Sequence, residues 1–256
     1  MGCSHPSSIV ARKSASARPP GFRTRPLAAM LCALALAAMA PWAHATGNLL
    51  VNGDAESAPG SDAGDVVPVP GWTVTAGNFT AITYNPNFGG VEAGSPGPVD
   101  RGLNYFGGGP SIELSVATQT IDLAFAAADI ASGQAGFELS GWLGGFSSQD
   151  DNAVLSATFL DGTNNALSSF SIGPVLAADR ENVTGLLFRS LTGSIPAGTG
   201  SALITLTLTR LQGGYDDGYA DNLSFSLQAV PEPGSAALLL GGAAVLGFLR
   251  RRRLQS

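Results

Sequence analysis

The most regular pattern in this chain is a strict alternation of apolar and polar residues within short segments. In the segment 203–209, leucine and isoleucine alternate with threonine, and the segments 223–227 and 112–116 alternate in the same way. Successive side chains of a strand point to opposite faces, so each segment predicts a strand with one apolar face. We expect apolar members such as Ile204 and Leu114 to face a core.

Further strands are predicted along the middle of the chain. Their segments are 48–52, 79–84, 118–123, 136–143, 153–160, 168–172 and 186–192. Turn-forming pairs such as Asp161-Gly162 and Gly213-Gly214 separate them. Only 124–131 is typical of a helix, of about two turns. Many short strands punctuated by glycine and proline predict an all-β antiparallel sandwich over residues 46–229.

The first 45 residues have a different pattern. Basic residues between positions 12 and 25 precede an apolar run at 27–40, which is followed by Ala43-His44-Ala45. This order is typical of a secretory signal peptide cleaved after Ala45. The alternative is a first transmembrane helix, which needs about 20 apolar residues. Pro41 interrupts the run too early for that.

A second apolar run, 236–249, lies in the closing segment 230–256. It follows Pro231, Glu232 and Pro233 and precedes Arg250, Arg251, Arg252 and Arg253. As a helix it would extend about 21 Å, which is short for a hydrocarbon core of about 30 Å. A buried amphipathic helix is the alternative, but the run lacks a polar face. It therefore predicts a short transmembrane helix with the arginines on the cytoplasmic side.

The order of Pro-Glu-Pro, short hydrophobic helix and terminal arginines closely resembles the PEP-CTERM sorting signal of Gram-negative bacteria. The resemblance implies that an exosortase, a membrane peptidase, recognises this segment and acts near the Pro-Glu-Pro. It also implies an exported protein of the cell envelope or the extracellular matrix, transiently anchored in the inner membrane. Proteins with this signal are associated with exopolysaccharide and biofilm.

The exported part of the chain has an unusual composition. Both cysteines, both histidines, the only lysine and all three methionines lie before Thr46. The part that follows carries 19 acidic residues against four arginines up to Pro233, a formal net charge of −15. This charge repels phosphate backbones, so we expect no nucleic-acid partner. Without histidine, cysteine or lysine, this part of the chain cannot form a typical zinc site, a Ser-His-Asp triad or a Schiff base. Among common catalytic mechanisms, only paired carboxylates or a metal held by oxygen atoms remain available.

Two motifs refine the predicted fold. Residues 48–56 read Asn-Leu-Leu-Val-Asn-Gly-Asp-Ala-Glu, and residues 217–224 read Asp-Gly-Tyr-Ala-Asp-Asn-Leu-Ser. The pair resembles the galactose-binding-like jelly rolls, including many carbohydrate-binding modules, in which such motifs lie together. The resemblance implies a jelly-roll β-sandwich and a structural calcium ion held by Glu56 and Asp221, with Asp54 as a possible extra ligand. The alternative is that Asp54 and Asp221 are turn residues and Glu56 is solvated.

Candidate ligand-binding residues follow from the chemistry of sugars. Their C–H faces stack on aromatic rings, and their hydroxyls need amide or carboxylate partners. The candidates are Trp142, Tyr105, Asp150 and Asp151. Trp142 shares a predicted strand face with Glu138 and could form a stacking platform, although such a tryptophan also packs beneath loops. Asp150 and Asp151 are alternatively part of a solvated loop.

Three functions fit these observations. The leading one is a non-catalytic exported protein that binds carbohydrate, such as exopolysaccharide, through a calcium-stabilised sandwich. The second is a purely structural surface protein without glycan binding. The third is a glycoside hydrolase or lyase with two carboxylates in a cleft, for instance among Glu92, Glu113 and Glu138.

Overall fold

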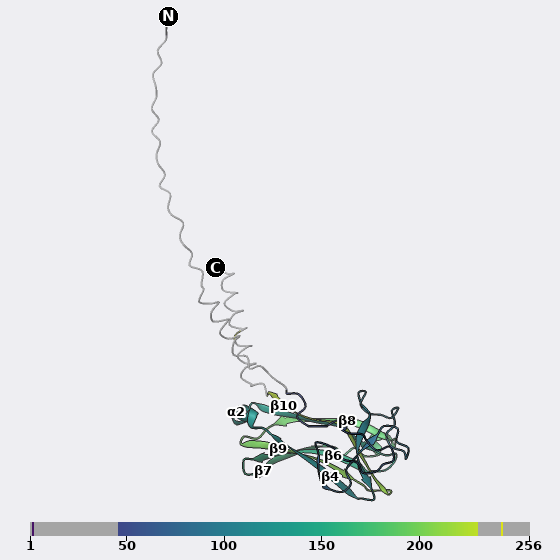
Figure 1. Cartoon of the computed structure of the whole chain (residues 1–256). Helices are drawn as coiled ribbons and strands as arrows, with labels where there is room; N and C mark the ends of the chain where they lie inside the picture. Colours follow the sequence, from purple (N-terminus) through teal and green to yellow (C-terminus); the bar gives the residue numbers. More distant parts are fainter. Residues whose placement is uncertain (1, 3–45, 230–241, 243–256) are drawn as a thin grey trace. The chain divides into compact units, whose positions relative to one another are not determined.

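The computed structural model describes residues 46–229, together with Gly2 and Gly242. Within these residues, ten strands form two five-stranded sheets that pack as two layers (Figure 1). The first sheet, in spatial order, contains β1 (Thr73–Ala76), β4 (Leu114–Asp122), β9 (Thr199–Thr209), β6 (Asn152–Asp161) and β7 (Ala166–Ile172). The second contains β2 (Thr80–Thr83), β3 (Asn104–Pro110), β10 (Tyr215–Ala229), β5 (Ala135–Gly145) and β8 (Gly185–Ser194).

Neighbouring strands within each sheet are antiparallel, which gives the predicted jelly-roll β-sandwich. The predicted helical segment 124–131 is confirmed as a short 3-10 helix, η1 (Ala124–Ala126), followed by α2 (Ala127–Ser132). A further 3-10 helix, η2 (Ala178–Arg180), precedes β8. The helices are short, so the two sheets form the body of the domain.

The main core lies between the two sheets, where the alternating pattern placed it. In β9, the side chains of Ile204, Leu206 and Leu208 are fully buried, and the threonines between them are not. Leu223 and Phe225 of β10 are buried in the same core. Full burial of one such side chain contributes about 1.5–3 kcal/mol, so these strands anchor the sandwich.

One predicted strand face is wrong. In β4, the side chain of Leu114 is 44% exposed, whereas Ser115 and Ala117 are fully buried. The chain at Gly77 packs closely against the start of this strand, and a Cβ there would lie 2.2 Å from the carbonyl oxygen of Leu114. Alternation correctly predicted a strand, but it did not say which face turns inward.

The strand predicted at 48–52 is also wrong. Residues 51–54 form turns, and the segment is held by single hydrogen bonds to β10, such as Leu49 N to the Phe225 carbonyl at 2.8 Å. Two observed strands, β1 and β3, were not predicted. β3 contains three consecutive glycines, and a Cβ at Gly107 would lie 2.3 Å from the Cδ1 atom of Ile82. This close packing requires glycine and removes the apolar alternation that identifies a strand.

A second, smaller apolar cluster lies on the outer face of the second sheet. Its buried members are Ile82, Val91, Tyr105, Leu186 and Tyr219. Val91 belongs to the long loop 84–103, which therefore covers one end of this face. Trp142 of β5 is partly buried and packs against this cluster.

Some predicted segments lie outside the described residues. They are the signal peptide at 1–45 and the closing segment 230–256, which includes the predicted transmembrane helix 236–249. Among the residues that the structure describes, no helix has the length and apolar character needed to cross a membrane.

Candidate functional site

The N-terminal loop and the last strand meet, as the two sequence motifs predicted. The pairing of β10 with β5 is irregular between Asp221 and Ser224, where β10 bulges. Asn48 binds this bulge, since its Nδ2 donates to the carbonyl oxygen of Leu223 at 2.9 Å. The backbone N–H of Leu223 in turn donates to the carbonyl of Gly53 at 2.8 Å. The loop 48–54 is thereby fixed along the edge of β10, beyond the part of β10 that pairs with β3.

The predicted calcium ligands occupy the same region. Asp221 is fully buried; its Oδ2 accepts a hydrogen bond from the Tyr84 hydroxyl at 2.6 Å, and its Oδ1 accepts one from the Asn222 N–H at 2.7 Å. Burial raises the pKa of Asp221 to about 7, and the charges of Glu56 and Asp54 reinforce the increase. Asp221 is therefore close enough to Glu56 and Asp54 for their charges to disfavour its ionised form.

Glu56 has a strong structural role of its own. Its Oε1 accepts hydrogen bonds from the backbone N–H groups of Leu103 and Asn104, both at 2.7 Å. This ties the N-terminal loop to the start of β3. Within residues 46–229, no group of three or more His, Cys, Asp and Glu side chains is arranged to hold a metal ion. Calcium at these residues stays a prediction.

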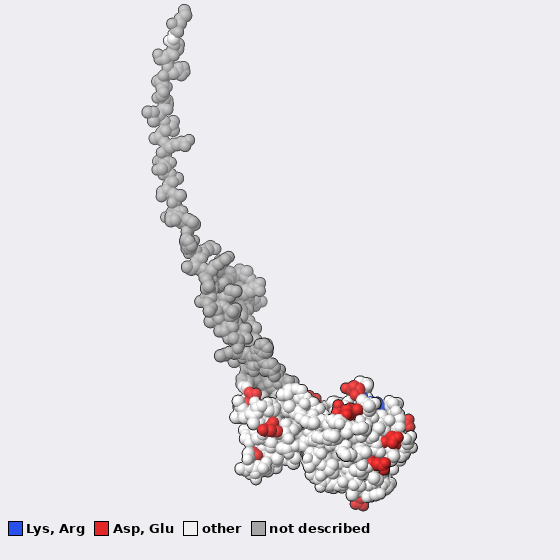
Figure 2. Space-filling model, viewed as in Figure 1, with Lys and Arg blue, Asp and Glu red and all other residues white. Residues whose placement is uncertain are grey.

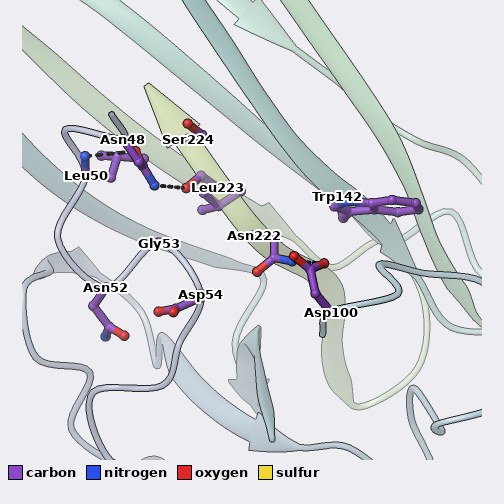
Figure 3. A pocket seen from close by; sticks show the side chains of 10 residues that line it. All are labelled: Asn48, Leu50, Asn52, Gly53, Asp54, Asp100, Trp142, Asn222, Leu223 and Ser224. Carbon is purple, nitrogen blue, oxygen red and sulfur yellow. Dashed lines mark hydrogen bonds between the residues drawn. The ribbon is translucent and has the colours of Figure 1, made fainter. Parts of the chain in front are cut away.

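A cavity of about 430 Å³ opens beside Trp142, and we call it the Trp142 cavity (Figure 3). Its walls come from residues 48–54, from Asp100 in the long loop, and from residues 222–224 of the β10 bulge. Figure 3 shows Asn222 and Asp100 between Asp54 and Trp142, with the indole at the edge of the cavity and its ring extending away from Asp54. Asn222 Nδ2 donates to Asp100 Oδ1 at 3.0 Å, which joins the long loop to the bulge.

An aromatic pair borders this cavity. Trp142 is half-buried, and its cross-strand neighbour Phe188 of β8 is 49% exposed. Their ring centroids lie 5.7 Å apart, with the planes tilted by 59°. A sugar can stack on such a partly exposed indole while its hydroxyls reach the polar wall.

The other predicted ligand residues do not line the Trp142 cavity. Tyr105 is fully buried in the outer apolar cluster, and its hydroxyl accepts a hydrogen bond from the Val91 N–H at 3.2 Å. Asp151 is fully buried as well, whereas Asp150 is exposed and its Oδ1 accepts from the Ala177 N–H at 3.1 Å. Since a sugar cannot reach buried groups, Tyr105 and Asp151 form no part of the site that we propose.

Sequence reasoning missed residues in and beside the site. Phe188, which packs against Trp142 without lining the cavity, could have been found, because it alternates with the partly buried Leu187 in a predicted strand. Asp100 carried no local signal, since the path of the long loop alone brings it to the β10 bulge. The candidate carboxylates for hydrolysis do not line the Trp142 cavity: Glu92 lies in the long loop, Glu113 before β4 and Glu138 on β5.

The surface around the domain is acidic, as the composition predicted. Figure 2 shows aspartate and glutamate side chains spread over the face in view. Arg101 is turned toward the protein, with its guanidinium 5.1 Å from the centre of the Tyr84 ring.

Comparison with known protein families gives a match at the C-terminal end of the chain. Residues 229–253 match the family described as the PEP-CTERM protein-sorting motif. The chain carries a PEP-CTERM sorting signal. This signal marks an exported protein of the cell envelope, as the order of Pro-Glu-Pro, apolar run and arginines predicted. No curated protein matches the chain.

Several solved structures are similar to the sandwich. A Family 16 Carbohydrate Binding Module-2 is 18% identical with a TM-score of 0.43, and the match covers 70% of this chain and 99% of that one. The CBM22-1 xylan-binding domain from Paenibacillus barcinonensis Xyn10C is 16% identical with a TM-score of 0.33, covering 67% and 92%.

The enzymatically active domain of tailspike protein 4 from Bacteriophage CBA120 is 19% identical with a TM-score of 0.41, covering 70% of this chain. The match spans only 21% of the tailspike chain. At these identities the similarities concern the β-sandwich alone.

Proposed function

We propose that this protein is a non-catalytic component of the cell surface or extracellular matrix that binds carbohydrate in the Trp142 cavity. The observation that carries the proposal is the partly exposed indole of Trp142 beside a polar cavity of about 430 Å³. Ligand sites commonly have volumes of about 300–1,000 Å³, with an apolar surface and a few convergent polar groups. The indole supplies the stacking surface, and the surrounding amides and carboxylates pair with hydroxyls.

The sorting signal supports the location of this activity. An exosortase-type peptidase would recognise residues 229–253 and act near Pro231-Glu232-Pro233, after the apolar run 236–249 has held the chain in the inner membrane. The sandwich would then reach the exopolysaccharide of the matrix.

Calcium is a second part of the proposal. Glu56 and Asp221, with Asp54, would hold a structural ion together with backbone carbonyl groups. The oxygen ligands suit a hard cation, and a cation would offset the charges of Glu56 and Asp54, which add to the effect of burial on the pKa of Asp221. Its role would be to fix the N-terminal loop, which forms one wall of the Trp142 cavity.

A glycan array tests the proposal directly. Purified full-length protein is applied to oligosaccharides of neutral, acidic and amino sugars, in calcium and in chelator. We expect saturable binding to at least one class of glycan. Absence of binding to every glycan in calcium would contradict the proposal and favour the purely structural role.

A further inference from the structure

The polar wall of the Trp142 cavity is acidic. Asp54 and Asp100 enter it from two separate loops, and both side chains belong to exposed residues. Asparagines supply most of its other polar groups. Behind the wall, Asp221 of β10 lies directly opposite Trp142 in the strand register and is fully buried. A ligand in this cavity therefore meets carboxylates and neutral amides.

No cationic side chain offsets these carboxylates inside the cavity. Four arginines are the only basic residues between 46 and 229, and none lines it. Arg101, the nearest in sequence to Asp100, donates from Nε, Nη1 and Nη2 to the backbone carbonyls of Pro98, Glu92 and Ser95. Its guanidinium is therefore committed to the long loop.

The remaining arginines are held in the same manner. Arg180 is buried and donates to the carbonyls of Ser147 and Gln149, at 3.0 and 2.8 Å. Arg210 donates to the carbonyls of Ile112 and Gly213. Arg189 follows Phe188 in β8, so its side chain starts from the face of the strand opposite to that of Phe188. An anionic ligand in the Trp142 cavity would therefore find no cationic side chain to pair with.

We propose that the Trp142 cavity selects a glycan that carries ammonium groups, namely a polymer of amino sugars, over its N-acetylated counterpart and over polymers of uronic acids. This inference rests on the proposed carbohydrate binding and adds its specificity. An ammonium group would donate a charge-assisted hydrogen bond to the Asp100 carboxylate while the sugar ring stacks on Trp142. A uronate would place its carboxylate against Asp100, and repulsion would disfavour it.

Asp100 is the residue that separates this inference from the calcium proposal. It is not among the predicted calcium ligands, so its charge remains in the cavity whether or not an ion binds. Its only hydrogen bond given by the structure comes from Asn222, and asparagine at position 100 could accept the same bond. The variant Asp100→Asn therefore removes charge while retaining the size and shape of the side chain.

The test measures binding of full-length protein to three oligosaccharides of equal length, made of glucosamine, N-acetylglucosamine or galacturonic acid. At about pH 6, where an amino-sugar ammonium is protonated, we expect the glucosamine oligomer to bind at least about tenfold more tightly than the N-acetylated one, and the uronate most weakly. Asp100→Asn should reduce the tenfold preference to about threefold or less, because the glucosamine oligomer should lose more affinity than the N-acetylated one. Asp129→Asn, an exposed carboxylate on α2, is the matched control and should change neither affinity.

Each contrary outcome overturns a different statement. Equal binding of the glucosamine and N-acetylated oligomers, or an unchanged preference in Asp100→Asn, would overturn the charge selection and leave carbohydrate binding intact. Binding of an oligolysine of equal charge as tightly as the glucosamine oligomer would overturn it too, because attraction would then not require a sugar. Binding of no oligosaccharide would instead overturn the proposed function.

Discussion

Trp142 of β5 and Phe188 of β8 form a cross-strand aromatic pair on the outer face of the second sheet, with ring centroids 5.7 Å apart. Aromatic pairs in cores are shielded from water, but 49% of the Phe188 surface is exposed here. Of the pair, Trp142 lines a cavity whose other lining residues are mostly polar. This combination is the basis of the carbohydrate-binding proposal.

Gly53 is required for contact between the N-terminal loop and β10. A Cβ at position 53 would lie 2.2 Å from the carbonyl oxygen of Leu223. We expect Gly53→Ala to lower the free energy of unfolding by at least about 2 kcal/mol, because the loop must move away from the bulge. Gly162→Ala, where a Cβ meets no atom within 4 Å, is the control and should cost little. Urea denaturation measures both; equal effects would contradict the close contact.

Asp151 stabilises the connection between β9 and β10 from inside the protein. Its carboxylate accepts backbone N–H groups of Leu211 at 2.7 Å, Gln212 at 2.8 Å and Asp217 at 3.1 Å. We expect Asp151→Asn to cost about 3 kcal/mol of unfolding free energy, because an amide nitrogen would face a donor. The exposed neighbour Asp150 offers the comparison. If Asp150→Asn destabilised the protein as much in urea, the structural role of Asp151 would be refuted.

The pH dependence of stability should reveal the buried carboxylates of β10. Burial raises the pKa of Asp216 to about 8, and neighbouring Asp151 and Asp217 raise it further. Because the folded state binds this proton more tightly than the unfolded chain, whose pKa is about 4, the free energy of unfolding should fall as pH rises from about 4 to about 8. One such group contributes a slope of up to about 1.4 kcal/mol per pH unit.

The variant Asp216→Asn should make this decline shallower in calcium-free buffer, while Asp129→Asn should retain it. The decline should not vanish, since burial also raises the pKa of Asp217 to about 6 and that of Asp221 to about 7. Urea denaturation across this pH range provides the measurement. Identical slopes in Asp216→Asn and the native protein would show that Asp216 is not the titrating group.

Calcium removal tests the proposed ion at Glu56 and Asp221. At a free concentration of about 100 times the dissociation constant, one bound ion stabilises the folded state by about 2.7 kcal/mol. We therefore expect chelator to lower the melting temperature of the native protein, and to have little effect on Asp221→Asn. An unchanged melting temperature of the native protein would rule out a stabilising ion.

Local sequence predicted most of the strands, but it did not always predict which face of a strand is buried. In β9 the apolar set is bulky and its partners are threonines, so the buried face was unambiguous. In β4 both faces contain apolar residues, so alternation alone did not identify the face with Ser115 and Ala117 as the buried one. β3 was not predicted, because its glycines allow close packing against Ile82 and Asp216 and therefore show no alternation of apolar and polar residues.

The candidate site was only partly accessible from sequence. The motifs at 48–56 and 217–224 predicted that two distant segments meet, and they do. The Trp142 cavity also needs Asp100, which reaches it through the path of a long loop. Tyr105 was a candidate because it is an aromatic residue next to the amide of Asn104, yet that loop covers it with Val91.

Titration calorimetry of Trp142→Ala with the glycan that binds the native protein most tightly tests the central claim most directly. The loss of stacking should weaken binding about tenfold or more, corresponding to about 1.4 kcal/mol. Phe125→Ala, which removes a 64% exposed ring on η1, should bind as the native protein does. A folded Trp142→Ala protein with native affinity would contradict the claim that this surface is where the protein binds carbohydrate.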